Sequence, residues 1–147
     1  MSFEKIRNAA TAFRLAIEGS DRSELSEGFS RFPWGSCGDA SLLLAAYLRD
    51  EGLGDFELIA ARGTNGDHAW LQQGEVVIDI TADQFTGFDF AVYVGNDEWH
   101  RQFGEIRTSE PADYHRYDAA TASILHWDYM RLKGRTLAHA THYGMGL

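Results

Sequence analysis

The 147-residue sequence is poor in cysteine, proline and basic residues, and each shortage excludes a class of protein. A single cysteine cannot form a disulfide within the chain, and it excludes zinc sites that are built on paired cysteines. Lys and Arg number 13 against 22 Asp and Glu, so the formal net charge is −9. This balance argues against binding to nucleic acid, which attracts clustered Lys and Arg, and against binding to an anionic membrane surface.

Long apolar runs are also missing. No segment approaches the ~18 consecutive apolar residues of a membrane-spanning helix, and no apolar signal-peptide core follows the first residues, Met-Ser-Phe-Glu-Lys-Ile-Arg. We therefore expect a cytoplasmic protein. Apolar residues make up 44% and charged residues 24% of the chain, as in an ordinary folded domain, and the length fits one domain over 1–147.

The spacing of apolar residues predicts two helices, then antiparallel strands, then a last helix. Residues 19–35 are rich in Gly, Ser and charge and predict a loop, and 96–111 are predicted to be irregular. The segment from 37 is apolar on nearly every side, which is typical of a buried helix. This order predicts an α+β domain. The predicted helices are 3–18, 37–49 and 112–133, and the predicted strands are 56–61, 68–72, 75–81 and 90–94.

Cys37 stands where the buried helix is predicted to start, in Phe-Pro-Trp-Gly-Ser-Cys-Gly-Asp. Ser36 and Asp39 have the spacing of a capping box, which makes Cys37 the first helical residue. The unpaired amides and the macrodipole at this helix end favour a thiolate and can hold an oxyanion. Gly38 leaves the backbone open to a substrate carbonyl. The alternative, a cysteine that only packs, belongs in the middle of an apolar helix, so the position favours a nucleophile.

His68 and Asp79 belong to two consecutive predicted strands. If Gln73-Gly74 is a two-residue hairpin turn, His68 lies directly opposite Asp79 on one face of the sheet. Asp79 stands among Val and Ile residues, and a buried carboxylate needs a partner. We therefore expect His68 to be a general base and Asp79 the acid that fixes its tautomer. The alternative is a surface histidine and a lone acid at a strand end.

Cys37, His68 and Asp79 together provide a nucleophile, a base and an orienting acid. The same three residues could instead bind zinc. A triad accounts for all three, however, and the sequence offers no evident fourth ligand. We therefore expect no metal and no other cofactor.

The segments Gly-Ser-Cys-Gly-Asp-Ala-Ser-Leu, Asp-His-Ala-Trp-Leu and Val-Ile-Asp-Ile-Thr resemble the transglutaminase-like branch of the papain-like cysteine enzymes. The resemblance covers residues 32–94. It implies a papain-like core, in which a buried helix that carries Cys37 packs on an antiparallel sheet that carries His68 and Asp79. It also implies that these three residues form the catalytic triad. The group includes peptidases, transglutaminases, deamidases and amide-cleaving enzymes.

The sequence departs from the papain-like pattern just before the cysteine, where that group usually has a glutamine that donates to the oxyanion. Arg31, Phe32 and Trp34 occupy this stretch, so the Cys37 amide needs a second donor, for which the indole of Trp34 is a candidate. Gln84, after the third predicted strand, either donates its amide to substrate or caps a turn. The residues expected to bind substrate are Trp34, Gly38, Trp70 and Gln84.

The expected function is that of a thiol-dependent hydrolase or acyltransferase that acts on a peptide or protein amide through a thioester. Cysteine peptidase, glutamine deamidase and transglutaminase remain alternative reaction types. A different alternative is a non-catalytic module on the same fold that binds a peptide or protein. The intact triad counts against this alternative, because a retired enzyme is free to lose one of its members.

Overall fold

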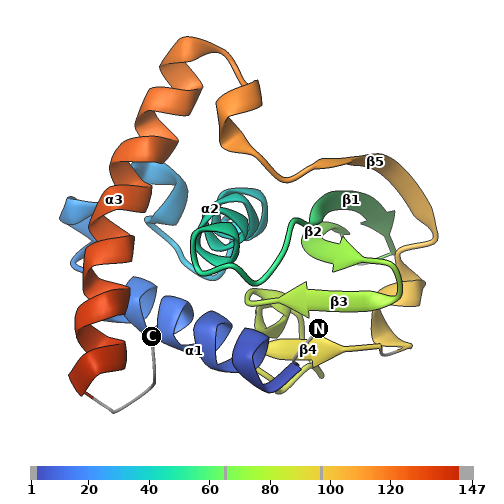
Figure 1. The fold of residues 1–147 in the computed structure, drawn as a ribbon. Helices are drawn as coiled ribbons and strands as arrows, with labels where there is room; N and C mark the ends of the chain where they lie inside the picture. The colour runs from blue at the N-terminus through green and yellow to red at the C-terminus, as the bar shows by residue number, and fades with distance from the viewer. Residues whose placement is uncertain (1–2, 65, 97, 143–147) are drawn as a thin grey trace.

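Three α-helices lie on one side of a five-stranded antiparallel sheet (Figure 1), in a computed structural model that describes residues 3–64, 66–96 and 98–142. The predicted α+β class is therefore confirmed. In the described ranges, no helix combines the length and apolar character that crossing a membrane requires. The main elements in chain order are α1 (Phe3–Gly19), α2 (Cys37–Asp50), β1 (Glu57–Gly63), β2 (Gly66–Gln73), β3 (Val76–Asp79), β4 (Tyr93–Gly95), β5 (Glu105–Pro111) and α3 (Ala119–His142).

Helix α2 lies at the centre of the molecule, between the sheet and the other two helices (Figure 1). It contacts β1 and β2 on one side and α1 and α3 on the other. Every residue from Ala40 to Leu48 is buried. The prediction of a buried helix is confirmed, because an element with neighbours all round has no side on which polar residues would face water.

The strands follow the order β4-β3-β2-β1-β5. Strands β2 and β3 form a hairpin in which Gln73 pairs with Val76 and Gln72 with Val77, so the turn is Gly74-Glu75 and the predicted register is wrong by two residues. Gly74 has φ +59° and Glu75 has no positive φ, as a type II′ turn with glycine first requires. A shift of two residues keeps every side chain on its predicted face, whereas a shift of one would have reversed them all.

The C-terminal third of the chain differs from the prediction. Residues 105–111, predicted to be irregular, form the edge strand β5, which pairs with β1 and has a register shift in the middle. Helix α3 begins at Ala119 rather than at 112, because Asp118 accepts hydrogen bonds from the amide and the hydroxyl of Thr121 at 3.0 and 2.8 Å and so caps it. Strand β4 is shorter than the predicted strand 90–94.

The two faces of the sheet carry different side chains. Ala69, Leu71 and Ile78 face the helices and belong to the main apolar core, and this face is called the helix side. Trp70 and Val77 belong to a second cluster on the opposite face, called the aromatic side. Because side chains alternate along a strand, His68 and Asp79 also belong to the aromatic side. The segment between β3 and β5 supplies the rings that cover it, namely Phe85, Tyr93, Trp99 and Phe103.

Candidate active site

Cys37 is the first residue of α2, as predicted, and its side chain is half-buried. The predicted capping box is not formed, because the buried hydroxyl of Ser36 donates to the carbonyl of Gly28 at 2.7 Å instead of capping the helix. The carboxylate of Asp39 lies so close to Gly28 that a Cβ there would collide with it. A Cβ at Gly38 would meet no heavy atom within 4 Å. The Ser36 hydroxyl thus leaves the first-turn amides uncapped beside an open stretch of backbone, which suits an oxyanion.

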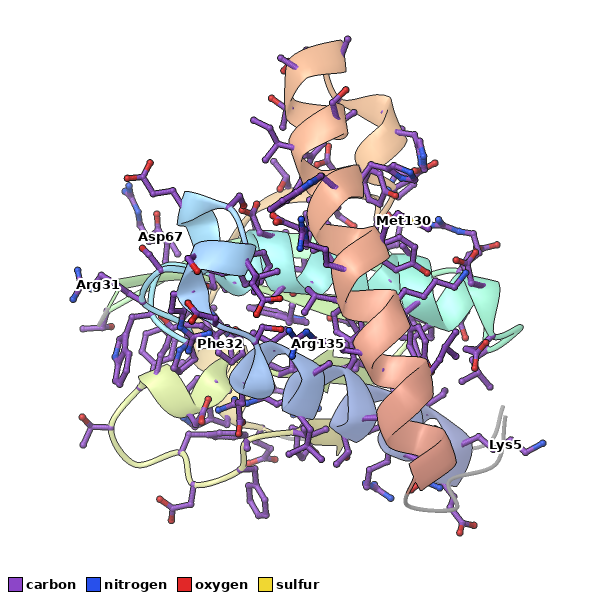
Figure 2. All side chains as sticks on the ribbon, turned by 90° about the vertical axis from the view of Figure 1, so that its left-hand side faces the viewer. Lys5, Arg31, Phe32, Asp67, Met130 and Arg135 are labelled. Carbon is purple, nitrogen blue, oxygen red and sulfur yellow. The ribbon has the colours of Figure 1, made fainter. Side chains whose placement is uncertain are left out.

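The loop that leads into Cys37 is held from two sides. The guanidinium of Arg14, on α1, lies 4.9 Å from the centre of the Phe32 ring. Asp128, on α3, accepts hydrogen bonds from the amide of Ser26 at 2.8 Å and from its hydroxyl. In Figure 2 this loop, marked by Arg31 and Phe32, and the start of β2, marked by Asp67, lie toward the same edge of the molecule. Trp34 is 55% exposed, so its indole is accessible to a ligand.

His68 and Asp79 are in direct contact. Nε2 of His68 lies 2.7 Å from Oδ2 of Asp79, and the two side chains are 0% and 1% exposed. With the observed hairpin register the two residues meet diagonally rather than directly opposite each other. The predicted partnership therefore exists although the predicted register is wrong, because the diagonal neighbour on the same face is within reach of a long side chain.

A second histidine contacts the same carboxylate oxygen. Nε2 of His100, in the 3₁₀ turn η4 (Trp99–Gln102), lies 2.6 Å from Oδ2 of Asp79 and is also buried. The sequence reasoning missed this residue. The one indication in the sequence was the buried Asp79 itself, because a carboxylate with four acceptor sites needs more donors than one imidazole supplies.

The hydrogen bonds to Asp79 determine how the two imidazoles are protonated. Burial works to raise the pKa of Asp79, but hydrogen bonds from His100 and His68 outweigh it and hold that pKa below its usual value. The other carboxylate oxygen accepts from the amide of Thr81 at 2.9 Å. Because an ionised carboxylate only accepts, both Nε2 atoms carry a proton. The lone pair of neutral His68 is then on Nδ1, which is the atom available to take a proton from a thiol.

The charge on His68 depends on Asp79 and on Cys37. Burial works to lower the pKa of His68, but the hydrogen bond to Asp79 and the neighbouring thiol of Cys37 outweigh it and raise that pKa to about 9. Cys37 therefore lies close enough to act on the ring. A histidine held between a carboxylate and a thiol is placed as the base of a nucleophile–base pair requires.

Gln84 is close to Nδ1 of His68. Its Nε2 lies 3.4 Å from this nitrogen and donates to the carbonyl of Thr81 at 3.1 Å. Asp83, the preceding residue, forms a two-pronged ion pair with Arg14 at 2.7 Å for both contacts. The same guanidinium donates to the carbonyl of Ile80 at 2.7 Å. Arg14 thus fixes the turn that carries Gln84, while its ring contact with Phe32 holds the loop before Cys37.

Aromatic rings enclose the His68 imidazole. Phe85 meets it edge-on at 5.0 Å, Phe103 lies at 5.4 Å and Trp70 at 5.8 Å between ring centres. Trp70 is only 2% exposed, and its indole N–H donates to Gln72 at 3.0 Å. At this position Trp70 supports the ring of His68, and its predicted contact with substrate stays a prediction. The enclosure shields the His68–Asp79 hydrogen bond from water, which strengthens it.

His68, Asp79 and His100 are also the residue types that bind transition metals, and their donor atoms lie within 4.8 Å of one another. The separations of 2.6 and 2.7 Å between nitrogen and oxygen are, however, the lengths of charge-assisted hydrogen bonds. All three side chains are buried, and Asp79 already accepts from Thr81. The arrangement fits a hydrogen-bonded triplet better than a set of ligands around an ion.

Comparison of the chain with models of known protein families, with curated proteins and with solved structures finds no match. The function proposed below is therefore inferred from the geometry of the site.

Proposed function

We propose that the protein is a thiol-dependent hydrolase or acyltransferase that acts on an amide or peptide carbonyl. We further propose that its helices and sheet are a papain-like core of the transglutaminase-like type. The observation that carries both proposals is the buried hydrogen bond between His68 and Asp79, together with the thiol of Cys37 acting on the same imidazole. The half-buried Cys37 at a helix start supports the first proposal, since a nucleophile must be both activated and accessible.

The first step transfers the thiol proton of Cys37 to Nδ1 of His68. Asp79 holds the opposite nitrogen and stabilises the imidazolium that results. The thiolate attacks the carbonyl carbon, a C–S bond forms, and the carbonyl electron pair moves to the oxygen. The backbone amides at the start of α2 stabilise this oxyanion, with the side chain of Gln84 or Trp34 as the second donor.

The second step releases the amine. The imidazolium of His68 donates its Nδ1 proton to the departing nitrogen, the C–N bond breaks, and a thioester on Cys37 remains. Water then attacks the thioester with His68 as base, the C–S bond breaks, and the acid leaves. An amine in place of water gives transglutamination, and ammonia as the departing group gives deamidation.

Alkylation by iodoacetamide tests the activated thiol without a known substrate. Because Cys37 is the only cysteine in the sequence, a single mass increase reports on it alone. We expect wild-type protein at pH 7 to react at least about tenfold faster than free cysteine, whose thiol is mostly protonated at that pH. His68→Ala should react like free cysteine, and Cys37→Ser should not be labelled.

Intact-mass measurement after incubation with glutamine-containing peptides tests the acyl transfer. An adduct that hydroxylamine removes, present in wild type and absent in Cys37→Ser, is the expected result. A thiol no more reactive than free cysteine, with no adduct from any peptide, would overturn the proposal.

A further inference from the structure

We infer that His100 is a positioning residue of the proposed triad: it holds Asp79 from the aromatic side and shares the charge of that carboxylate with His68. The inference depends on the proposed function, since positioning matters only if His68 acts as a base. It assigns a role to a residue outside the cysteine, histidine and aspartate that the chemistry requires.

The geometry places Asp79 between two imidazoles. The two Nε2 atoms lie 2.7 and 2.6 Å from the same Oδ2, and the rings of His68 and His100 are 6.2 Å apart with 26° between their planes. Thr81 holds the other oxygen through its amide. A carboxylate fixed by three donors from different segments has one orientation, so His68 is held in one orientation as well.

Sharing the carboxylate also sets the strength of the base. A second N–H donor on Oδ2 takes part of the negative charge that would otherwise act on His68 alone. Without His100 the carboxylate would hold the His68 imidazolium more tightly. The imidazolium would then give its proton to a leaving amine less readily. His100 thus makes the His68 imidazolium a better proton donor to the leaving amine in the second step.

The surroundings of His100 favour this role over simple packing. Its ring lies 5.0 Å from Trp70 and 4.9 Å from Trp99, both edge-on, so aromatic neighbours orient it. Among the residues that the structure describes, the charged and titratable groups that face it include Asp79 and His68 from the sheet and Tyr93 from β4 at 6.0 Å. Glu75 and Arg101 line the same cavity of about 290 Å³ as His100. Asp79 lies within hydrogen-bond distance of Nε2 of His100.

Nuclear magnetic resonance of protein labelled with ¹⁵N-histidine tests the inference on the whole chain. At neutral pH we expect two protected Nε2 protons, from His68 and His100. In His100→Phe the midpoint of the His68 titration should rise by about one unit, the worth of one charged hydrogen bond. In His100→Gln, which restores an N–H donor, the midpoint should stay close to that of wild type. The adjoining cavity leaves room for either side chain.

Val77→Ala is the matched control, because Val77 is buried on the same strand and face as Asp79 but carries no polar group. It should lower stability and leave the His68 titration unchanged. Three results would overturn the inference: an unprotonated Nε2 on His100, a midpoint unmoved in both His100 variants, or loss of both Nε2 protons on adding zinc. Each can occur while Cys37 still reacts rapidly with iodoacetamide, so failure of the inference is distinct from failure of the proposed function.

Discussion

The two faces of the sheet bury different kinds of side chain, with opposite effects on folding free energy. On the helix side, Leu43, Leu71 and Ile78 are fully buried in the main apolar core, and such burial is the main source of folding free energy. On the aromatic side, burial of Asp79 and two histidines costs free energy that hydrogen bonds must offset. A fold gains more stability from apolar residues at such positions, and exceptions of this kind are expected at functional sites.

The same two strands provide both faces. In β2, Ala69 and Leu71 face the helices, while His68 and Trp70 face the aromatic cover. In β3, Ile78 faces the helices and Asp79 the cover. A rigid core on one side therefore holds His68 and Asp79 on the other, which is how a scaffold can keep side chains to within fractions of an ångström.

Replacement of Asp79 by Asn should disrupt the hydrogen bonds on the aromatic side and have the largest effect on the reaction rate. The amide of Thr81 requires an oxygen at one position, so the NH₂ of Asn would face the two Nε2–H donors. His68 must then move its proton to Nδ1 and can no longer accept one from the thiol. We expect a loss of about 10³–10⁴ in acyl-transfer rate and a fall of Cys37 alkylation to the rate of free cysteine. Unchanged alkylation in a folded variant would contradict this assignment.

Replacement of Leu71 by Ala should instead weaken the packing of the apolar core on the helix side. Leu71 is fully buried against the helices, so its loss should lower the free energy of unfolding by about 2–5 kcal/mol. Urea unfolding gives this value directly. At temperatures where the variant stays folded, Cys37 should be alkylated at the wild-type rate. A large loss of thiol reactivity would show that the two faces are not separable.

The pH dependence of the free energy of unfolding should also differ between the two faces of the sheet, with a smaller effect. The pKa of His68 is about 9 in the folded protein and about 6.5 when unfolded. Its stabilising contribution is therefore complete below about pH 6.5 and is lost as the pH rises through about 9. Urea unfolding at pH 6, 8 and 10 should show a decline in wild type that is shallower in His68→Gln. Leu71→Ala should keep the wild-type slope, since it removes no titratable group.

The helices and the central hairpin could be predicted because local sequence patterns, namely the spacing of apolar residues and the turn glycine, determine them. Nine successive buried residues in α2 left no other place for that helix than the core. The predicted hairpin register was wrong because glycine can occupy either central position of a two-residue turn. The sequence therefore fits both a Gln73-Gly74 turn and the observed Gly74-Glu75 turn, in which Gly74 comes first with positive φ. Face alternation survived the error, so the partnership of His68 with Asp79 was still predictable.

Strand β5 and His100 could not be predicted, because long-range contacts decide both. Residues 105–111, Glu-Ile-Arg-Thr-Ser-Glu-Pro, are mostly polar, and Ile106 is exposed. They form a strand because β1 offers an unpaired edge. His100 reaches Asp79 only because the segment after β3 folds back over the sheet, and no spacing along the chain encodes that return.

The half-buried Cys37 has a consequence for oxidative chemistry. Oxidants attack thiolates first, and a sulfenic acid is commonly protected when a nearby second cysteine closes a disulfide. The 147 residues contain no second cysteine, so an oxidised Cys37 depends on a small-molecule or protein thiol from outside for its recovery. Peroxide should therefore inactivate this centre reversibly only while such a reductant is present.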